Sequence, residues 1–386
     1  MSRSVCSLAI AAICAGAVLS SGQVHSSTTQ NSVALIATPA AYVYVAHATS
    51  NGNGQIEGFV ASSNGALTPI LGSPFPYAVN YMAASGRTLF GVEGGNGVDA
   101  GQVIESYLIG SNGALTFQTS QKVPDSYGGV ISIYTDRTGS SLYADYLITN
   151  NDYLSYSVTP SNGTLAYVGM LEEGPAQGSP LSFVESNEFG YSSACYHYMA
   201  QIYGLERGND GSLSLLNIIP ELPEEKSGGF YCPWRAAADS TSHVAVAMQP
   251  LNLDWNPDGP WQIATYTADS AGNLTTGSTY SNMPNVKVGN VVDYKTSPSG
   301  KLLAVAGTAG LQLFGFNGGN PIQSLTGPVI TTPLDQVFWD NANHIYAISR
   351  TTGQLYVFCV SAKGVIQAAG SPHSIPGIVN LFVAAK

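Results

Sequence analysis

The chain has 386 residues, of which 44% are apolar and only 10% are charged, so it can bury a large hydrophobic core. Its 13 basic and 24 acidic residues give a net charge of −11, and a surface of this sign repels nucleic acid and anionic lipid head groups. We therefore expect neither a nucleic acid nor an anionic membrane surface as a partner.

The N-terminal 22 residues have the composition of a secretory signal peptide. Arg3 provides a positive charge, residues 8–19 form an apolar run, and residues 20–22 are small enough for cleavage to follow them. The apolar run is too short to cross a bilayer as a permanent span, and no later segment resembles one. We therefore expect a secreted or periplasmic protein without a transmembrane span. A lipid anchor on Cys14 is the alternative.

A degenerate S-x-N-G-x-L motif then recurs seven times, each time after a strand-like run. The closing apolar residues are separated by 48, 50, 48, 61, 48 and 44 residues; they are Leu67, Leu115, Leu165, Leu213, Leu274, Ile322 and Ile366. A period of this length, with four strands in each repeat, is typical of β-propeller blades. The sequence predicts an all-β, seven-bladed propeller of four-stranded antiparallel blades over residues 41–386. A Ser-, Thr-, Gln- and Asn-rich flexible leader at 23–40 is expected to precede it.

The second repeat shows how one blade is built. Residues 77–85 predict an inner strand, 87–94 a second strand, 102–109 a third strand and 115–121 an outer strand. These runs are rich in β-branched and aromatic residues and are bounded by Gly, Asn and Ser, as short strands joined by tight turns require. An Asn-Gly pair at 112–113 predicts the turn between the third and the outer strand.

The two ends of the repeat region complement each other. Residues 377–386 match the inner strand of other repeats, whereas residues 41–48 match a second strand that has no inner strand before it. We therefore predict that the C-terminal strand joins the N-terminal blade. Such closure removes the exposed sheet edges that would otherwise invite aggregation.

The longest interval contains two insertions, residues 217–229 and 249–260. The first precedes an inner strand and the second joins a second strand to a third, and in a propeller both connections emerge on the same face. Aromatic rings stack on the C–H faces of sugars, and charged groups bind their hydroxyls. We predict a site on this face for a carbohydrate, a small molecule or a protein, formed by Trp234, Arg235, Asp254, Trp255 and Trp261. Alternatively, these side chains only hold the two loops against the disc.

The second insertion contains the first half of a calcium-loop motif. Asp254, Asn256 and Asp258 alternate and are followed by a glycine, so they are candidate metal ligands. Thr265 stands where a bidentate Glu would complete the loop. A turn without metal is the alternative, and we expect the protein to require no cofactor.

Two cysteines are candidates for a disulfide. Cys195 ends a predicted second strand and Cys232 begins the inner strand of the next blade, on the same face. An exported protein permits a bridge between them, although two separate thiols remain an alternative. Cys359 lies in a third strand beside a large aromatic residue and is expected to be an inert buried thiol.

The central channel is a second candidate site. His47 and Glu93 stand at the ends of second strands in adjacent blades, where they could serve as an acid/base pair. A simple hydrogen-bonded channel lining is the alternative. The chain contains no G-x-S-x-G, no H-E-x-x-H and no glycine-rich phosphate loop, so these hydrolase, metalloprotease and nucleotide motifs give no support to catalysis.

The register of "YVYVAHA…GQIEGFVASSNGALTPILGSP" (42–74) and "IYAISRTTGQLYVFCVSAKGVIQAAGSP" (345–372) resembles the seven-bladed lactonase-type propellers. That family includes the 6-phosphogluconolactonases and the YVTN-repeat surface proteins, and the resemblance implies the same fold. Lactonases carry Pro-His-x-His, Gly-Pro-Arg-His and Asn-Glu signatures. The corresponding segments here, residues 127–136, 178–186 and 191–196, match none of the His, Arg or Glu residues of those signatures. No catalytic residue is therefore transferred from the family.

Together these observations predict an exported, monomeric, non-catalytic propeller that binds a ligand on the face carrying residues 217–261. The alternative is a hydrolase that opens a lactone at the central channel with a diverged active site, of the 6-phosphogluconolactonase type that the resemblance implies.

Overall fold

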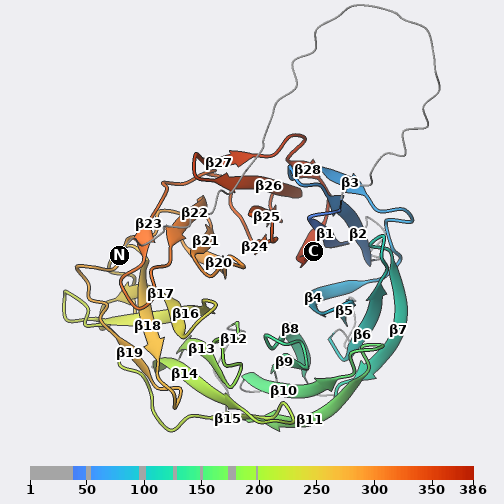
Figure 1. The fold of residues 1–386 in the computed structure, drawn as a ribbon. Helices are drawn as coiled ribbons and strands as arrows, with labels where there is room; N and C mark the ends of the chain where they lie inside the picture. The colour runs from blue at the N-terminus through green and yellow to red at the C-terminus, as the bar shows by residue number, and fades with distance from the viewer. Residues whose placement is uncertain are drawn as a thin grey trace, which may run out of the picture.

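The computed structural model describes residues 38–48, 54–94, 101–124, 128–147, 151–172, 180–196 and 199–386. Within these ranges every regular element is a β-strand, and no helix there is long and apolar enough to cross a membrane. The predicted signal peptide and most of the predicted leader lie outside the described residues. Figure 1 shows the strands as a ring of sheets around a central axis.

Seven antiparallel sheets form the ring, as the seven repeats predict. In each blade the strands follow one another outward from the axis (Figure 1), and blade 7 carries one additional short strand, β28, beside β26. Blade 1 consists of β29 (Ile378–Ala385), β1 (Ala41–Ala48), β2 (Gly54–Ala61) and β3 (Leu67–Pro69).

The other six blades each use four or more strands that are consecutive in the chain. Blade 2 consists of β4 (Val79–Ser85), β5 (Thr88–Glu93), β6 (Val103–Ile109) and β7 (Leu115–Lys122). Blade 3 consists of β8 (Gly129–Thr135), β9 (Ser141–Leu147), β10 (Asn151–Val158) and β11 (Leu165–Leu171). Blade 4 consists of β12 (Ser182–Phe183), β13 (Phe189–Tyr196), β14 (Met199–Arg207) and β15 (Leu213–Leu215). Blade 5 consists of β16 (Phe230–Ala238), β17 (His243–Leu251), β18 (Gln262–Ala268) and β19 (Leu274–Thr276). Blade 6 consists of β20 (Val291–Thr296), β21 (Leu302–Gly307), β22 (Gly310–Gly315) and β23 (Gln323–Ser324). Blade 7 consists of β24 (Gln336–Trp339), β25 (His344–Ser349), β26 (Gln354–Ser361), β27 (Gly364–Gln367) and β28 (His373–Ser374).

Blade 1 closes the ring by combining the two ends of the repeat region. β29 pairs antiparallel with β1 from Ala41 opposite Ala385 to His47 opposite Ile378. The predicted closure is therefore confirmed. Main-chain hydrogen bonds along this ladder pair β29 with the inner edge of β1, so β1 is not left as an unpaired strand edge. Leu381 of β29 is fully buried in the same sheet.

The hydrophobic core lies between neighbouring blades. The seven large side chains that the repeat places in the third strands are all buried; they are Phe59, Tyr107, Tyr156, Leu205, Tyr266, Phe314 and Phe358. Each blade thus presents one apolar face to the blade before it and one to the blade after it. Burial of this kind, at about 1.5–3 kcal/mol per large side chain, is the main favourable term for the ring.

The glycine of the repeat motif also joins blades. Gly113 adopts a φ of 86° in its turn, and its carbonyl oxygen accepts a hydrogen bond of 2.7 Å from the Tyr44 hydroxyl of blade 1. A Cβ at Gly113 would lie 2.7 Å from the ring of Tyr42, so a larger residue would push the blades apart. Gly272 accepts the same kind of bond from Tyr191 at 2.7 Å. The motif therefore shapes a turn and docks it on the preceding blade.

The two insertions meet on one face, as predicted. The first lies between β15 and β16 and the second between β17 and β18. The Ser227 hydroxyl donates to the Asp258 carboxylate at 2.6 Å, which links the loops directly. The Glu225 carboxylate accepts hydrogen bonds from Ser227 and from the Gly229 main chain, so the first insertion is also ordered from within.

Deleting residues 377–386 should prevent cooperative folding, because it removes the inner strand of blade 1. Leu381→Ala should lower the free energy of unfolding by about 2–5 kcal/mol, the usual cost of truncating a buried leucine. Lys363→Ala, at an exposed residue, is the control. Size-exclusion chromatography and thermal unfolding would measure both effects, and a soluble, cooperatively melting truncation would contradict the closure.

Candidate functional site

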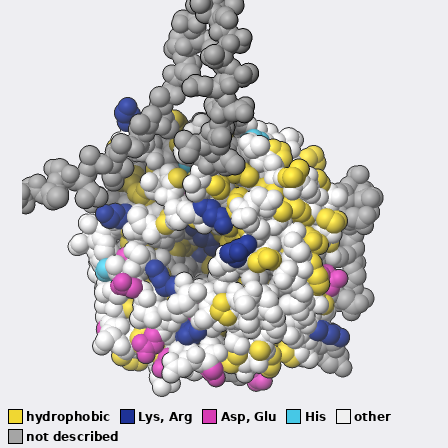
Figure 2. Space-filling model, turned by 45° about the vertical axis from the view of Figure 1, so that its right-hand side comes forward, with side chains coloured by type: hydrophobic (Ala, Val, Ile, Leu, Met, Phe, Trp, Pro, Cys, Tyr) yellow, Lys and Arg dark blue, Asp and Glu magenta, His cyan; other side chains and the backbone are white. Residues whose placement is uncertain are grey.

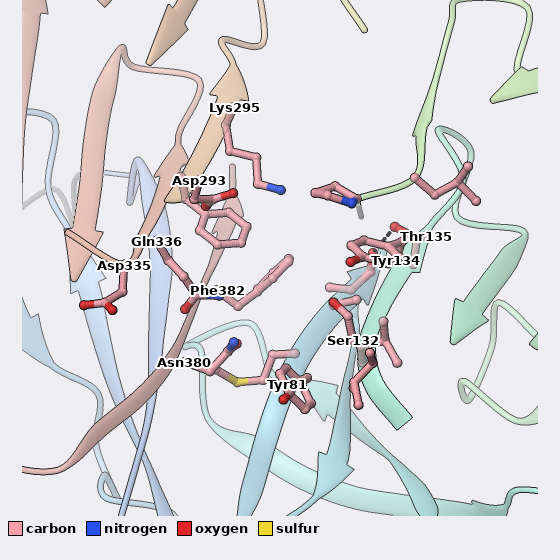
Figure 3. A pocket seen from close by; sticks show the side chains of 18 of the residues that line it. Tyr81, Ser132, Tyr134, Thr135, Asp293, Lys295, Asp335, Gln336, Asn380 and Phe382 are labelled. Carbon is pink, nitrogen blue, oxygen red and sulfur yellow. Dashed lines mark hydrogen bonds between the residues drawn. The ribbon is translucent and has the colours of Figure 1, made fainter. Parts of the chain in front are cut away.

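The inner strands enclose a cavity of about 380 Å³ in the central channel. Six of them, β4, β8, β16, β20, β24 and β29, line it directly, together with the residues that precede β12. Because every blade reaches the cavity, side chains that lie far apart in the sequence converge there. Figure 3 shows Lys295 extending into the channel from β20, with Tyr134 and Thr135 on the opposite wall.

A β-bulge recurs in five of the inner strands and places a side chain in the channel each time. The register shifts by one residue in β4, β8, β16, β20 and β29. A bulge bends the strand locally and re-aims the residues beside it. The residue that follows each bulge lines the cavity; these residues are Tyr81, Ser132, Arg235, Asp293 and Asn380. We call these five residues the bulge ring.

Three basic and two acidic side chains line the cavity. Arg235 and Asp293 face each other with 3.8 Å between Nη1 and Oδ1, and Asp335 and Arg350 form a second pair at 4.0 Å. The Nζ of Lys295 lies 5.4 Å from the centroid of the Phe338 ring. Figure 2 shows Lys and Arg side chains gathered around a hollow in the middle of one face. The channel is therefore more basic than the protein as a whole.

Two buried polar atoms in the bulge ring have no hydrogen-bond partner among the described residues. One is Oδ1 of Asn380, whose residue is only 3% exposed, and the other is Nε of Arg235. Leaving such an atom unpaired costs about 1–3 kcal/mol, so native proteins rarely retain one without a function. Both atoms are themselves buried, so a molecule in the cavity would not contact them where they lie.

Asp145 lies directly behind the bulge ring, opposite Ser132 in the β8–β9 ladder. The residues opposite the other four ring members are apolar; they are Ala46, Val92, Ala247 and Ala306. Asp145 is 1% exposed, and neither of its carboxylate oxygens has a hydrogen-bond partner among the described residues. Burial, and to a lesser extent the charge of Asp152, raises the pKa of Asp145 to about 8. A neutral carboxylic acid is thus held one strand behind the channel wall.

Of the residues predicted from the sequence, Arg235 lies in the channel. His47 and Glu93 do not line the cavity that the described residues form. The Nε2 of His47 is instead 3.6 Å from the Glu57 carboxylate in its own blade, and Glu93 is an exposed residue at the end of β5. The ends of the second strands therefore contribute less to the cavity than the inner strands do.

The three tryptophans are half-buried at separate places around the insertions. Trp234 is the extra residue of the bulge in β16, next to Arg235. Trp255 packs edge-on against Phe230 with 4.7 Å between ring centroids. Trp261 contacts the core between blades 5 and 6, and its Nε1 lies 3.4 Å from Asn290. These contacts fit the role of holding the loops to the disc, and the ligand-binding role stays a prediction.

The segment with the calcium-loop pattern forms a turn around Asn252. Its side-chain oxygen accepts the main-chain N–H groups of Asp254 and Asn256, both at 3.0 Å. The Asp258 carboxylate is engaged by Ser227. Nowhere among the described residues are three or more His, Cys, Asp or Glu side chains grouped to hold a metal ion. The residues therefore fit an Asx-stabilised turn better than a calcium cage.

A disulfide links blades 4 and 5. The Sγ atoms of Cys195 in β13 and Cys232 in β16 are bonded, which is the pairing expected from the sequence. Cys359 is buried in β26. Cys232 stands three residues before Arg235 in the same strand, so the bridge anchors the strand that carries this channel residue.

Most of the channel residues were not predicted from the sequence. Asp293 and Lys295 stand two apart on an inner strand, and Asn380 interrupts the apolar C-terminal strand. Residues two apart point to the same face of a strand, so polar pairs of this kind on predicted inner strands were a usable signal. The bulges, which shift this pattern by one residue, carried no comparable signal.

The fold is similar to solved lactonase-type propellers. A structure from Bacteroides uniformis described as a "putative 6-phosphogluconolactonase" aligns with a TM-score of 0.67 and 13% identity, covering 89% of this chain and 99% of that one. A protein from Bacteroides fragilis with the same description aligns with a TM-score of 0.64 and 13% identity, covering 89% of this chain and 98% of that one. A protein from Lactobacillus plantarum aligns with a TM-score of 0.59 and 12% identity, covering 89% of this chain and 99% of that one.

The sequence matches no protein-family model and no curated protein. The structural likeness therefore shows the fold: a seven-bladed β-propeller similar to these solved structures. At 12–13% identity it defines the fold and not a reaction.

The ionisation of Asp145 should make stability depend on pH. Its pKa is about 8 in the folded protein and near 3.8 when unfolded, so its stabilising contribution is complete below about pH 4 and is lost as pH rises through about 8. Asp145→Asn should therefore be more stable than the wild type at pH 8, on the order of 5 kcal/mol, and similar to it at pH 4. Urea unfolding at both pH values would measure this difference. Asp254→Asn, the same change at an exposed residue, is the control. If the stability of the wild type and of Asp145→Asn depended on pH in the same way, the raised pKa of Asp145 would be excluded.

Removing the disulfide should destabilise the protein without altering its fold. The bridge closes a loop of 37 residues, for which loop entropy predicts a stabilisation of roughly 3–4 kcal/mol. The Cys195→Ser/Cys232→Ser double variant should melt at a lower temperature than the wild type. Dithiothreitol should lower the melting temperature of the wild type and leave that of the variant unchanged; a variant as stable as the oxidised wild type would contradict the assignment.

Proposed function

We propose that this protein is an exported, non-catalytic propeller that binds one small polar molecule in its central channel. The observation that carries the proposal is the convergence of basic side chains on one cavity of an acidic protein. Arg235 and Lys295 line this cavity, and Lys295 forms no ion pair with a carboxylate among the described residues. A cavity of this charge attracts small polar or anionic molecules.

The size of the cavity supports a small ligand. Its volume of about 380 Å³ lies near the lower end of the range of roughly 300–1,000 Å³ typical of small-molecule sites. The rings of Phe338 and Phe382 lie at its wall with 5.5 Å between their centroids, and they offer an apolar surface beside the charged groups. A ligand with both a polar and an apolar face fits this lining.

Hydrolysis of a lactone in the same channel is the second candidate. The similarity to lactonase-type propellers favours it, and Asp293 and Asp335 are carboxylates at the cavity. A lactonase needs a group that takes a proton from water, and both carboxylates are already engaged. Asp293 accepts the Val337 N–H at 3.0 Å and Asp335 accepts the Arg350 N–H at 2.7 Å, in addition to their facing arginines. Binding therefore ranks ahead of hydrolysis.

The face with the two insertions is a possible extension of this site. Arg235 belongs to the predicted set on that face and also to the channel lining, so a ligand larger than the cavity would reach toward Trp234 at the adjoining bulge. Trp255 and Asp254 lie farther along the second insertion. Substitutions at Arg235 and Trp255 separate the two locations.

Export is supported by two independent features. The N-terminal sequence has the pattern of a signal peptide, and the disulfide between Cys195 and Cys232 is of a kind that persists in oxidising compartments. We therefore place the protein outside the cytoplasm.

Arg235→Met should weaken binding of a channel ligand and change the melting temperature little, because the methionine retains the apolar stem. A thermal-shift screen of monosaccharides, sugar acids and lactones against the purified protein would identify ligands, and calorimetry would then compare variants. We expect affinity to fall at least about tenfold in Arg235→Met, the loss of a charge-assisted hydrogen bond.

Trp255→Ala is the matched variant for the insertion face. Unchanged affinity in Trp255→Ala together with a loss in Arg235→Met supports the channel, and the reverse pattern moves the site to the insertions. Lactone turnover that disappears in Asp293→Asn or Asp335→Asn would establish hydrolysis in place of simple binding.

A further inference from the structure

The outer edges of the blades differ in length. The fourth strand spans only two to four residues in five of the blades, whereas β7 in blade 2 spans eight and β11 in blade 3 spans seven. Figure 1 shows β7 and β11 on the outside of the ring, where no further strand of the described residues follows them. A long edge strand presents a row of main-chain donors and acceptors to other chains, and a short one avoids this. Blades 2 and 3 therefore have the edges that can accept another strand.

The edge of β7 is covered by its own glutamine side chains. Gln118 is the extra residue of a bulge in this strand, and its amide donates to the carbonyls of Thr116 and Phe117 at 3.2 and 3.1 Å. The amide of Gln121 donates to the carbonyl of Lys122 at 2.7 Å. These carbonyls are already engaged, and a lysine ends the strand. Both features protect an edge against pairing with another chain.

The equivalent positions of β11 carry no such cover. Val168 is the extra residue of the same bulge in β11, and Leu171 stands where β7 has Gln121. Among the described residues, no side chain donates a hydrogen bond to a main-chain carbonyl of residues 167–171. Because the bulge is common to both strands, the two edges differ by their glutamines. β11 is thus a long edge without cover.

The side chains of β11 also favour pairing. The strand contains neither a charged residue nor a proline, and Tyr167 and Met170 are 44% and 38% exposed. A Cβ at Gly169 would meet no described atom within 4 Å, so the surface is open there. Uncharged segments of about six or seven residues with apolar and aromatic side chains are the ones that pair most readily with copies of themselves.

Charge selects the orientation of a second copy on this edge. In an antiparallel pair related by a two-fold axis, each residue of β11 faces a residue of the same uncharged segment, so no like charges oppose each other along the ladder. Glu172 follows the strand directly and is exposed. The antiparallel arrangement places the two Glu172 side chains at opposite ends of the ladder, whereas a parallel one would bring them side by side.

We propose that the protein forms a symmetric dimer in which the β11 strands of two copies pair antiparallel and join their blade 3 sheets into one continuous sheet. Tyr167 and Met170 of each copy pack across the junction. The contact uses the same strand on both copies, so it closes as a dimer and does not grow into a filament. This inference is independent of the channel ligand, and it departs from the monomer that the sequence predicts.

Sedimentation velocity over a range of protein concentrations tests the proposal. A single ladder buries little surface, so we expect a dissociation constant on the order of 10–100 μM. The net charge of −11 makes two copies repel each other. Added salt should therefore strengthen the dimer, because it screens that repulsion and leaves the main-chain hydrogen bonds in place.

Exchanging the residues at the bulge tests the role of the glutamine cover. Val168→Gln should raise the dissociation constant at least about tenfold, because the new side chain covers the edge as Gln118 covers β7. The reciprocal Gln118→Val should add species larger than a dimer, since a second edge of each copy becomes available.

A lysine on the edge provides a second, matched pair of variants. Tyr167 and Phe117 occupy equivalent positions, are 44% and 45% exposed, and pack edge-on against a tyrosine of the third strand with 5.8 and 6.0 Å between ring centroids. Tyr167→Lys should abolish the dimer, and Phe117→Lys should leave it unchanged. Thermal unfolding of each variant confirms that it is folded. Val168→Gln and Tyr167→Lys act independently, so either one can decide the outcome if the other does not fold.

Three results would overturn the proposal. A wild type that stays monomeric up to about 500 μM at high salt excludes the second copy and leaves only a strand of a different protein as the occupant of this edge. A dimer that persists unchanged in Val168→Gln and in Tyr167→Lys forms through another surface. A dimer that Phe117→Lys disrupts and Tyr167→Lys does not forms through β7 in place of β11.

Discussion

The ladder between β1 and β29 is the constraint on which the other features of the structure depend. Its backbone hydrogen bonds join the two ends of the repeat region, and without them blade 1 would lack its inner strand. Only a closed ring brings all seven blades to a common axis. The channel residues come from strands spread over some three hundred positions of the chain, so each depends on this closure for its place.

The bulges explain how an apolar core and a polar channel coexist in the same strands. Inner strands must present apolar side chains to their neighbouring blades, and a regular strand alternates its faces strictly. A one-residue bulge turns the next side chain toward the axis without disturbing the pairing on either side of it. Arg235, Asp293 and Asn380 reach the cavity in this way, and the same device places Tyr81 and Ser132.

Three polar features described above belong to the consecutive blades 3 to 6. The disulfide binds blade 4 to blade 5, the Arg235–Asp293 contact joins blade 5 to blade 6, and Asp145 lies buried in blade 3 behind the channel wall. Two of the three channel cations, Arg235 and Lys295, come from blades 5 and 6, on the side of the ring that carries the insertions. A ligand held there would contact blades 5 and 6 first, and its binding would then be sensitive to the bridge that anchors β16.

The amino-acid sequence by itself determined the seven blades, their four-stranded order and the closure by the last strand, because each leaves a local pattern with a fixed period. For Cys195 and Cys232 it left a bridge and two separate thiols open, and the structure shows the bridge. Only the tertiary structure decided the site. It places His47 near Glu57 and neither His47 nor Glu93 in the cavity lining, and it brings Arg235, Lys295 and Asn380 from three different blades to one cavity. The physical reason is that a channel is a property of the closed ring: which side chain faces the axis depends on one-residue bulges and on the curvature of all seven blades together, and neither is written in the spacing of the repeats.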